Sequence, residues 1–110
     1  ICVITNDGWW KKTSGYLQHH AYARLRAIET RRYVARSANT GVSSVINHVG
    51  EVKKKIEWDV KDVLEYTIPI FNHKTFYVKY GDFIGRLCSL FSVFLLLYFF
   101  VLNKLKIKSK

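Results

Sequence analysis

The sequence predicts an α/β domain followed by a single helix that is long enough to cross a membrane. Three observations predict it. A β-branched apolar run occupies residues 1–5, a helical repeat of apolar residues spans residues 17–31, and residues 87–102 form a run without charge. Such patterns are typical of a buried strand, an amphipathic helix and a membrane helix respectively. The 110 residues suffice for one small domain beside that helix.

The first element is expected to be a central strand of a sheet. Residues 1–5 read ICVIT and offer no polar alternation, which is typical of a strand buried on both faces. Asn6, Asp7 and Gly8 then predict a turn, and a polar loop continues to Gly15.

Residues 17–31 are expected to form a helix that buries one apolar face. The members of that face recur at three- and four-residue spacing: Leu17, Ala21, Leu25 and Ile28. Ser14 is placed to cap the first turn. Arg31 and Arg32 suit the negative end of the helix dipole.

Three more strands are expected after this helix. Residues 33–38 and 42–47 form two of them, and residues 39–41 (Asn-Thr-Gly) provide a tight connection between them. Residues 63–68 form a third short strand, which Pro69 terminates.

The last helix is expected to span a membrane. Residues 83–103 come close to the roughly 20 residues that a bilayer requires. A buried core helix is the alternative, but the rest of the chain is too small to enclose so apolar a segment. The predicted boundaries are a domain at 1–82, the membrane helix at 83–103 and a basic tail at 104–110.

The charge of the chain is strongly positive, with 18 basic and 8 acidic residues. Such a chain can bind nucleic acid, anionic lipid or an acidic protein. Five arginines favour nucleic acid: Arg24, Arg26, Arg31, Arg32 and Arg36. Glu29 interrupts that group and no nucleic-acid motif accompanies it, so we expect the bilayer, and no nucleic acid, as a partner.

Four segments, in order, carry a resemblance that spans almost the whole chain. Residues 4–10 read ITNDGWW, residues 18–29 read QHHAYARLRAIE, residues 36–41 read RSANTG and residues 75–82 read TFYVKYGD. Together they resemble the apolipoprotein N-acyltransferases, which belong to the nitrilase superfamily. Two departures occur: Lys11 stands where that family usually has Gly, and Lys79 where it has Arg. The first puts the loop conformation in doubt.

The resemblance implies the C-terminal part of a nitrilase-like αββα sandwich, followed by one transmembrane helix. It also implies a chemistry in which a Glu base deprotonates a Cys nucleophile and a Lys stabilises the oxyanion. The implied acyl donor is a membrane phospholipid, and the acceptor is the N-terminal diacylglyceryl-cysteine of an apolipoprotein. No cofactor and no metal are expected. The implied location is the bacterial inner membrane.

The implied topology follows from the lysines after the last helix, at positions 104, 106, 108 and 110. By the positive-inside rule they place the C-terminus in the cytoplasm, which leaves the preceding domain in the periplasm.

The resemblance places the family's catalytic Glu, Lys and Cys upstream of this chain. Cys2 maps onto the first strand and Cys88 onto the predicted membrane helix, so both are expected to be inert packing residues. The chain begins at Ile1 and contains no methionine, which favours a segment of a longer protein. Such a segment is expected to be inactive and poorly folded alone.

Three residues are candidates for substrate contact. Trp9 and Trp10 follow the C-terminal end of a strand, where α/β folds build their sites. They are expected either to line an acyl channel, to reach the membrane interface or to anchor the loop by packing. His19 lies at the start of the helix and is either a substrate contact or a structural histidine.

Five further residues are expected to shape the site structurally: Asn6, Asp7, Glu29, Arg36 and Asn39. Among them, Asn39 serves a turn. Glu29 belongs to a cluster of ion pairs with the neighbouring arginines.

A different class of protein is the alternative. A small, basic, single-pass membrane-anchored binding protein without enzymatic activity would fold independently and have a defined partner. The central strand predicted at residues 1–5 argues against it, because such a strand requires neighbours and the domain would be a sheet with an open edge.

Overall fold

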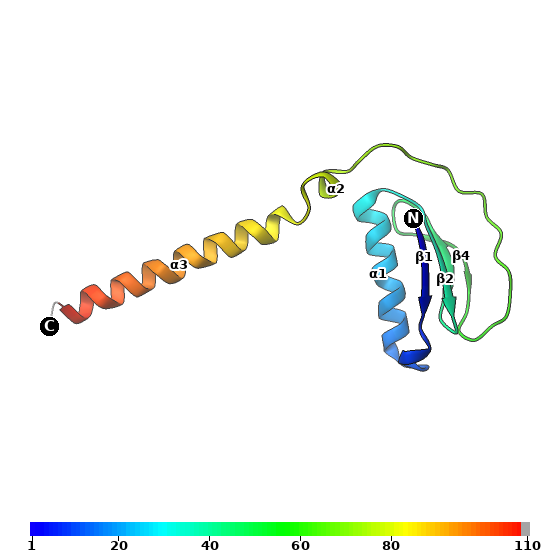
Figure 1. The fold of residues 1–110 in the computed structure, drawn as a ribbon, viewed down its shortest axis with the longest axis horizontal. Helices are drawn as coiled ribbons and strands as arrows, with labels where there is room; N and C mark the ends of the chain where they lie inside the picture. The colour runs from blue at the N-terminus through cyan, green and yellow to red at the C-terminus, as the bar shows by residue number, and fades with distance from the viewer. Residues whose placement is uncertain (109–110) are drawn as a thin grey trace. The chain divides into compact units, whose positions relative to one another are not determined.

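Four strands form one mixed sheet in the computed structural model, which describes residues 1–108. In sheet order they are β1 (Cys2–Asn6), β2 (Val34–Asn39), β3 (Ser43–Ile46) and β4 (Val52–Ile56). The β1–β2 pair is parallel (Figure 1), and the β2–β3 and β3–β4 pairs are antiparallel. The α/β prediction is confirmed.

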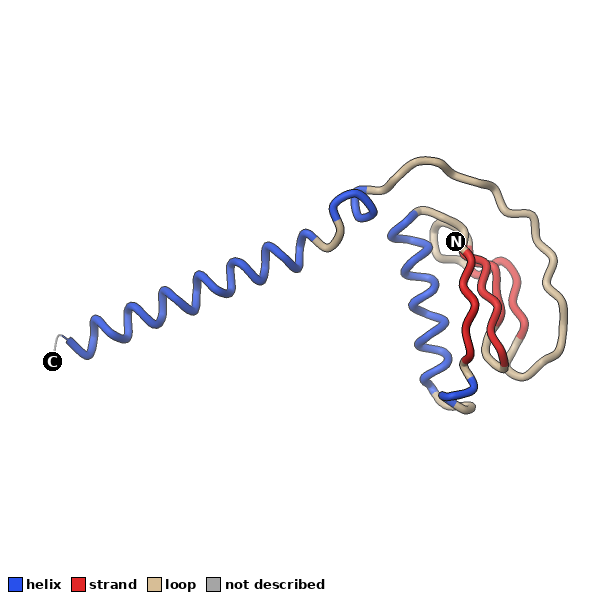
Figure 2. Tube along the Cα trace, in the orientation of Figure 1, coloured by secondary structure: helices blue, strands red, loops and turns tan. Residues whose placement is uncertain are grey.

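The helix α1 (Ser14–Thr30) connects the two parallel strands and covers one face of the sheet (Figure 2). A crossover of this kind is what a parallel pair requires. The cap is Thr13 and not the predicted Ser14, because Thr13 is still extended and its side chain accepts a bond from the Gly15 amide at 3.3 Å. At the other end, Arg31 adopts a left-handed conformation with φ of 51°.

The prediction of which face of this helix is buried was wrong. Leu17 and Leu25 stay about half exposed, at 53% and 48%. The sheet instead packs against two alanines, and the resulting core consists of Ala23, Ala27, Val34 and Ile46. Alanine allows the helix to lie close to the sheet, which brings the polar side chains on either flank within reach of the strands.

The strand β1 is less buried than its composition predicted. It lies at one end of the sheet order, and Ile4 is 90% exposed. Val3 packs against the core, whereas Cys2 is exposed, which corrects the expectation of a buried cysteine. Within residues 1–108, β1 pairs with β2 alone, and the face that carries Ile4 has no helix over it.

Residues 63–68 do not form the strand that their composition predicted. Val63 is 89% exposed, and no ladder hydrogen bonds involve this segment among the described residues. A β-branched sequence becomes a strand only when a neighbouring strand pairs with it, and no strand within residues 1–108 pairs with this segment. A short helix, α2 (Phe76–Tyr80), occurs further on in a region for which no element was predicted.

The second unit of the chain, from Tyr80 onward, consists mainly of α3 (Phe83–Lys108). By length and composition this helix can cross a membrane, and none of its apolar window is buried. It is longer than the predicted 83–103, because Lys104 and Lys106 continue it as good helix formers. Lys110 lies outside the described residues.

Candidate functional site

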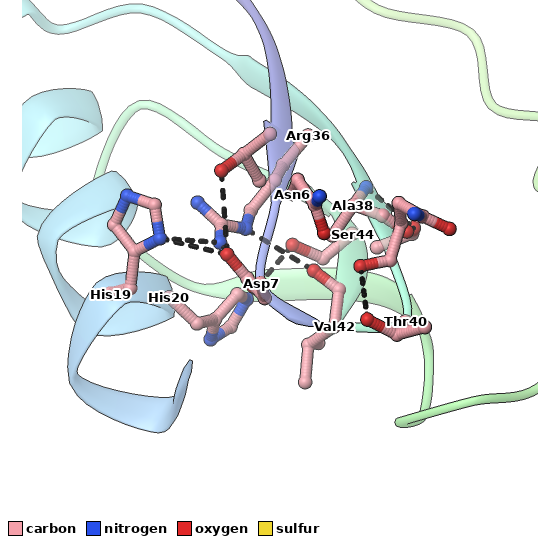
Figure 3. A network of polar contacts seen from close by, with 12 residues as sticks. Asn6, Asp7, His19, His20, Arg36, Ala38, Thr40, Val42 and Ser44 are labelled. Carbon is pink, nitrogen blue, oxygen red and sulfur yellow. Dashed lines mark hydrogen bonds and ion pairs between the residues drawn. The ribbon is translucent and has the colours of Figure 1, made fainter. Parts of the chain in front are cut away.

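A buried ion pair joins the C-terminal end of β1 to the middle of β2. Asp7 directly follows β1, Arg36 lies within β2, and their side chains are 0% and 1% exposed. The Arg36 Nη2 atom lies 2.7 Å from Asp7 Oδ2 (Figure 3). Because both charges have lost their water, each depends on the other for its solvation.

Further hydrogen bonds complete the surroundings of this pair. Arg36 Nε donates to the carbonyl of Val42 at 3.2 Å, and the Thr5 hydroxyl donates to Asp7 Oδ1 at 3.3 Å. The backbone amide of Asp7 donates to the carbonyl of Asn39 at 3.3 Å. The pair therefore connects β1, β2 and the turn between β2 and β3.

His19 on α1 approaches the same carboxylate. Its Nδ1 atom lies 2.8 Å from Asp7 Oδ1 and 3.3 Å from Arg36 Nη2. One nitrogen cannot donate to Asp7 and accept from Arg36 at once, and the shorter bond to a carboxylate is the stronger. We therefore assign the proton to Nδ1. In the neutral ring the Nε2 atom then carries the lone pair and can accept a hydrogen bond, and the side chain is 40% exposed.

The neighbouring His20 points to a different strand. Its Nε2 lies 2.8 Å from the Ser44 hydroxyl on β3. Burial lowers the pKa of His20, and the positive charges of Arg36 and Arg24 lower it further. Two adjacent histidines thus attach α1 to two places, the residue that follows β1 and the strand β3.

The pKa of Asp7 is also shifted. Burial acts to raise it, but the bonds from His19 and Arg36 and their charges together outweigh burial, and the net pKa lies below the ordinary value. The carboxylate is therefore ionised in the folded protein.

These shifts predict two steps of acid destabilisation. His20 is neutral when folded, so stability begins to fall as pH drops below about 6.5, the ordinary histidine pKa. The Asp7 contribution is complete above about pH 4 and is lost as pH falls through its lowered pKa. Urea midpoints of the complete protein should show both steps, and His20→Gln should remove only the first. An equal loss between pH 7.5 and 5.5 in parent and variant would contradict the assignment.

The loop after β1 is fixed by short-range contacts. Asn6 Oδ1 accepts a bond from the Gly8 amide at 3.0 Å, and Gly8–Trp10 form one turn of 3-10 helix, η1. The Trp10 carbonyl accepts a bond from the Thr13 hydroxyl at 2.6 Å. This hydroxyl also caps α1, so the loop and the helix are tied at one side chain.

The two tryptophans of this loop differ in exposure. Trp9 is 84% exposed, whereas Trp10 is 49% exposed. The Trp10 ring lies over Gly15 so closely that a Cβ at Gly15 would stand 2.8 Å from its Cε3 atom. Trp10 is therefore a packed anchor of the loop, and Trp9 is free to contact another molecule.

Glu29, predicted near the site, lies elsewhere. It occupies the last turn of α1, where its Oε2 is 3.0 Å from Arg26 Nη1. The contact is an ion pair without hydrogen-bond alignment, since that oxygen has no hydrogen-bond partner among the described residues. Asn39 contributes its backbone carbonyl to the network and not its side chain.

Three residues of this hydrogen-bond network were not predicted from the sequence: Thr5, Val42 and Ser44. Two of them act through small hydroxyl groups and one through a backbone carbonyl, and none of these carries a sequence signal. Gly41 was assigned to a turn, but it also lies directly against Asp7.

The fold and the matching sequence profile define the class of protein. The chain belongs to the carbon-nitrogen hydrolase family, whose profile matches residues 1–71. Its sequence is similar to those of apolipoprotein N-acyltransferases. The protein of that name from Chlorobaculum tepidum is 38% identical over 80% of this chain, and that from Bradyrhizobium diazoefficiens is 40% identical over 74%. The one from Rickettsia bellii is 35% identical over the whole chain.

The chain spans only a part of each of these relatives. It covers 16% of the Chlorobaculum tepidum protein, 15% of the Bradyrhizobium diazoefficiens protein and 22% of the Rickettsia bellii protein.

Proposed function

We propose that this chain is the C-terminal part of an apolipoprotein N-acyltransferase. The complete protein would transfer an acyl chain from a membrane phospholipid to the N-terminal diacylglyceryl-cysteine of a lipoprotein. The observation that carries the proposal is the similarity of 38% over 80% of the chain to a protein of that name. The membrane-length helix α3 beside the hydrolase-family domain supports it, because the acyl donor resides in a bilayer.

In this proposal the catalytic Glu, Lys and Cys belong to the part of the protein that precedes Ile1. Cys2 is exposed on the edge strand and is followed by Val3, so its context does not match that of the nucleophile in the family. The chain alone is therefore inactive. Its own contribution is to hold the loop of η1 and the imidazole of His19 in place.

The residues around the η1 loop have different proposed roles. The Asp7–Arg36 pair holds the backbone at the start of the η1 loop in place. Trp9 extends from that loop and provides an apolar contact for an acyl chain. His19 Nε2 is oriented by Asp7 and can accept a proton from a polar group of the substrate.

The proposed topology follows the lysines after the apolar run. Residues 1–82 form the periplasmic domain, α3 crosses the inner membrane, and the basic C-terminus lies in the cytoplasm. A reporter enzyme that is active only in the periplasm, fused after Lys110, should be inactive, and the same reporter inserted before Phe83 should be active.

The proposal is tested by reading the coding sequence upstream of Ile1 and assaying its product. An open frame that encodes apolar helices and the catalytic Glu, Lys and Cys, with acyl transfer to a diacylated lipopeptide by the product, is the expected result. A start codon directly before Ile1 with a stop behind it would overturn the proposal. The alternative of a small membrane-anchored binding protein would then stand.

The two tryptophans provide a matched pair of substitutions. Trp9→Ala is expected to raise KM for the phospholipid donor severalfold with little change in stability, because its ring is 84% exposed. Trp10→Ala is expected to lower stability, because its ring packs on Gly15. Steady-state kinetics and urea midpoints on the complete protein would separate the two. Equal effects on KM would contradict the division of roles.

A further inference from the structure

The loop between β1 and α1 presents aromatic and basic side chains to solvent. It contains η1 and ends where α1 begins (Figure 1). Four consecutive residues of this η1 loop are exposed: Trp9, Trp10, Lys11 and Lys12. Indole rings beside ammonium groups make this part of the surface apolar and cationic at once.

The two lysines of the η1 loop have no counterion within residues 1–108. No ion pair among these residues involves Lys11 or Lys12. The acid that precedes them in the sequence, Asp7, is buried and already belongs to an ion pair of its own. Lys53 on β4 differs, because its Nζ atom lies 2.6 Å from Glu51 Oε2. The ammonium groups of the η1 loop are therefore available to an anion from outside the domain.

Lys11 has a backbone conformation that suits glycine. Its φ of 48° and ψ of −163° lie beside the region that only glycine adopts freely. Its amide donates to the Gly8 carbonyl at 3.2 Å, and its carbonyl accepts a bond from the Thr13 amide at 2.9 Å. Glycine could make the same two bonds without a strained Cβ, so the backbone of the loop does not require a lysine. What lysine adds at this position is its ammonium group.

Aromatic rings beside lysines suit two classes of macromolecule. Tryptophan is enriched where a membrane meets water, and lysines at that boundary attract anionic lipids. Single-stranded nucleic acid is bound by a similar combination, in which bases stack on aromatic rings. The chain itself favours lipid, because it carries α3, a helix that is long and apolar enough to cross a membrane.

We propose that Lys11 and Lys12 bind the headgroup phosphate of an anionic phospholipid, whose acyl chain contacts Trp9. The inference rests on the proposed function, since it assigns a headgroup preference to the acyl donor of that reaction. Phosphatidylglycerol carries a net negative charge, whereas the choline of phosphatidylcholine cancels the charge of its phosphate. A lysine near an anionic lipid surface contributes about 1 kcal/mol, which corresponds to roughly fivefold in affinity.

The first readout measures lipid contact and not activity. The complete protein is placed in nanodiscs of phosphatidylcholine with increasing fractions of phosphatidylglycerol that is brominated on its acyl chains. Bromine quenches the fluorescence of a tryptophan in contact, and the difference between each protein and its Trp9→Phe counterpart isolates Trp9. Lys11→Gly and Lys12→Gln are each expected to raise the fraction needed for half-maximal quenching about fivefold. Lys53→Gln, which removes a paired lysine, is the control and should leave that fraction unchanged.

The stability of Lys11→Gly separates a binding role from a structural one. The substitution relieves the backbone at position 11, so the urea midpoint is expected to stay equal or rise while the quenching weakens. Lys11→Arg keeps the positive charge and should retain the quenching of the parent. Unchanged quenching in both Lys11→Gly and Lys12→Gln would overturn the proposal. A response of Trp9 fluorescence to oligothymidylate, with none to the brominated lipid, would also overturn it and assign the loop to nucleic acid.

The second readout tests the choice of acyl donor. The KM of Lys11→Gly is expected to rise about fivefold with phosphatidylglycerol as donor and less than about twofold with phosphatidylcholine. Equal rises with both donors would overturn the headgroup preference. A parent protein inactive with both donors would refute the proposed function, while the quenching experiment would still decide whether the η1 loop binds anionic lipid.

Discussion

Arg36→Met is expected to destabilise the complete protein by about 3–5 kcal/mol, because it leaves the carboxylate of Asp7 buried without a counterion. The side chain of Asp7 is 0% exposed, and the remaining bonds from His19 and Thr5 do not supply a permanent charge. Urea denaturation at pH 7 would measure the loss. The destabilisation should become smaller towards pH 4, where the unpaired carboxyl can protonate.

The matched control is the double variant Arg36→Met with Asp7→Asn. It removes both charges and keeps the volume, so its stability should return to within about 1–2 kcal/mol of the parent, as replaced buried pairs often do. Asp7→Asn alone should lower the stability about as much as Arg36→Met does, since it leaves the guanidinium of Arg36 buried without a counterion. If the double variant were as unstable as the sum of both singles, the two residues would not be coupled as the 2.7 Å contact indicates.

Gly41→Ala is expected to have the second-largest effect. A Cβ at this position would stand 2.1 Å from Asp7 Oδ2 and 2.6 Å from Asp7 Cγ, so Asp7 must move away from Arg36. Overpacking of this kind costs about 1–3 kcal/mol, and disruption of the ion pair adds to it. We expect a lower urea midpoint together with reduced acyl transfer, because the displaced carboxylate also loses its bond to His19.

Gly8→Ala is the control for this substitution. Its added Cβ would meet Asn6 Oδ1 at 3.0 Å and Thr40 Oγ1 at 3.3 Å, and both are the ends of side chains that are less buried than Asp7 and need to shift by only a few tenths of an ångström. Its effect should be clearly smaller than that of Gly41→Ala. Similar effects for the two glycines would mean that the turn, and not the contact with Asp7, determines the requirement for glycine.

Local patterns predicted most of the elements but not their burial. The run at residues 1–5 was correctly predicted to be a strand, since β-branched residues favour extended backbone wherever they lie. The prediction that this strand is buried was wrong, since Ile4 is 90% exposed. Burial depends on neighbouring elements, which the local pattern does not encode. The helix of residues 17–31 was placed within a few residues, but its buried face follows from close packing of Ala23 and Ala27 on the sheet.

The candidate site was only partly accessible from the sequence. Asp7, His19 and Arg36 were each singled out through the resemblance, and the structure brings these three together. Their mutual contacts depend on the parallel pairing of β1 with β2, which places residues 29 positions apart side by side. The hydrogen bonds from Arg32 to the Phe71 carbonyl and from Thr75 to the Glu29 carbonyl could not be predicted from the sequence, because both acceptors are backbone atoms.

The parallel pairing of β1 and β2 also sets an order of events during synthesis. Cys2 pairs with Ala35, 33 positions later, whereas Arg36 and Ser44 in the next hairpin are only 8 apart. A ribosome that adds about 5–20 residues per second leaves β1 without this partner for roughly 2–7 s. The β2–β3 hairpin can close soon after its turn emerges, while the β-branched segment ahead of it still waits. Of the strand pairs within residues 1–108, the parallel pair is therefore the one whose first strand waits longest for its partner, because β1 waits for β2 longer than β2 waits for β3 or β3 for β4.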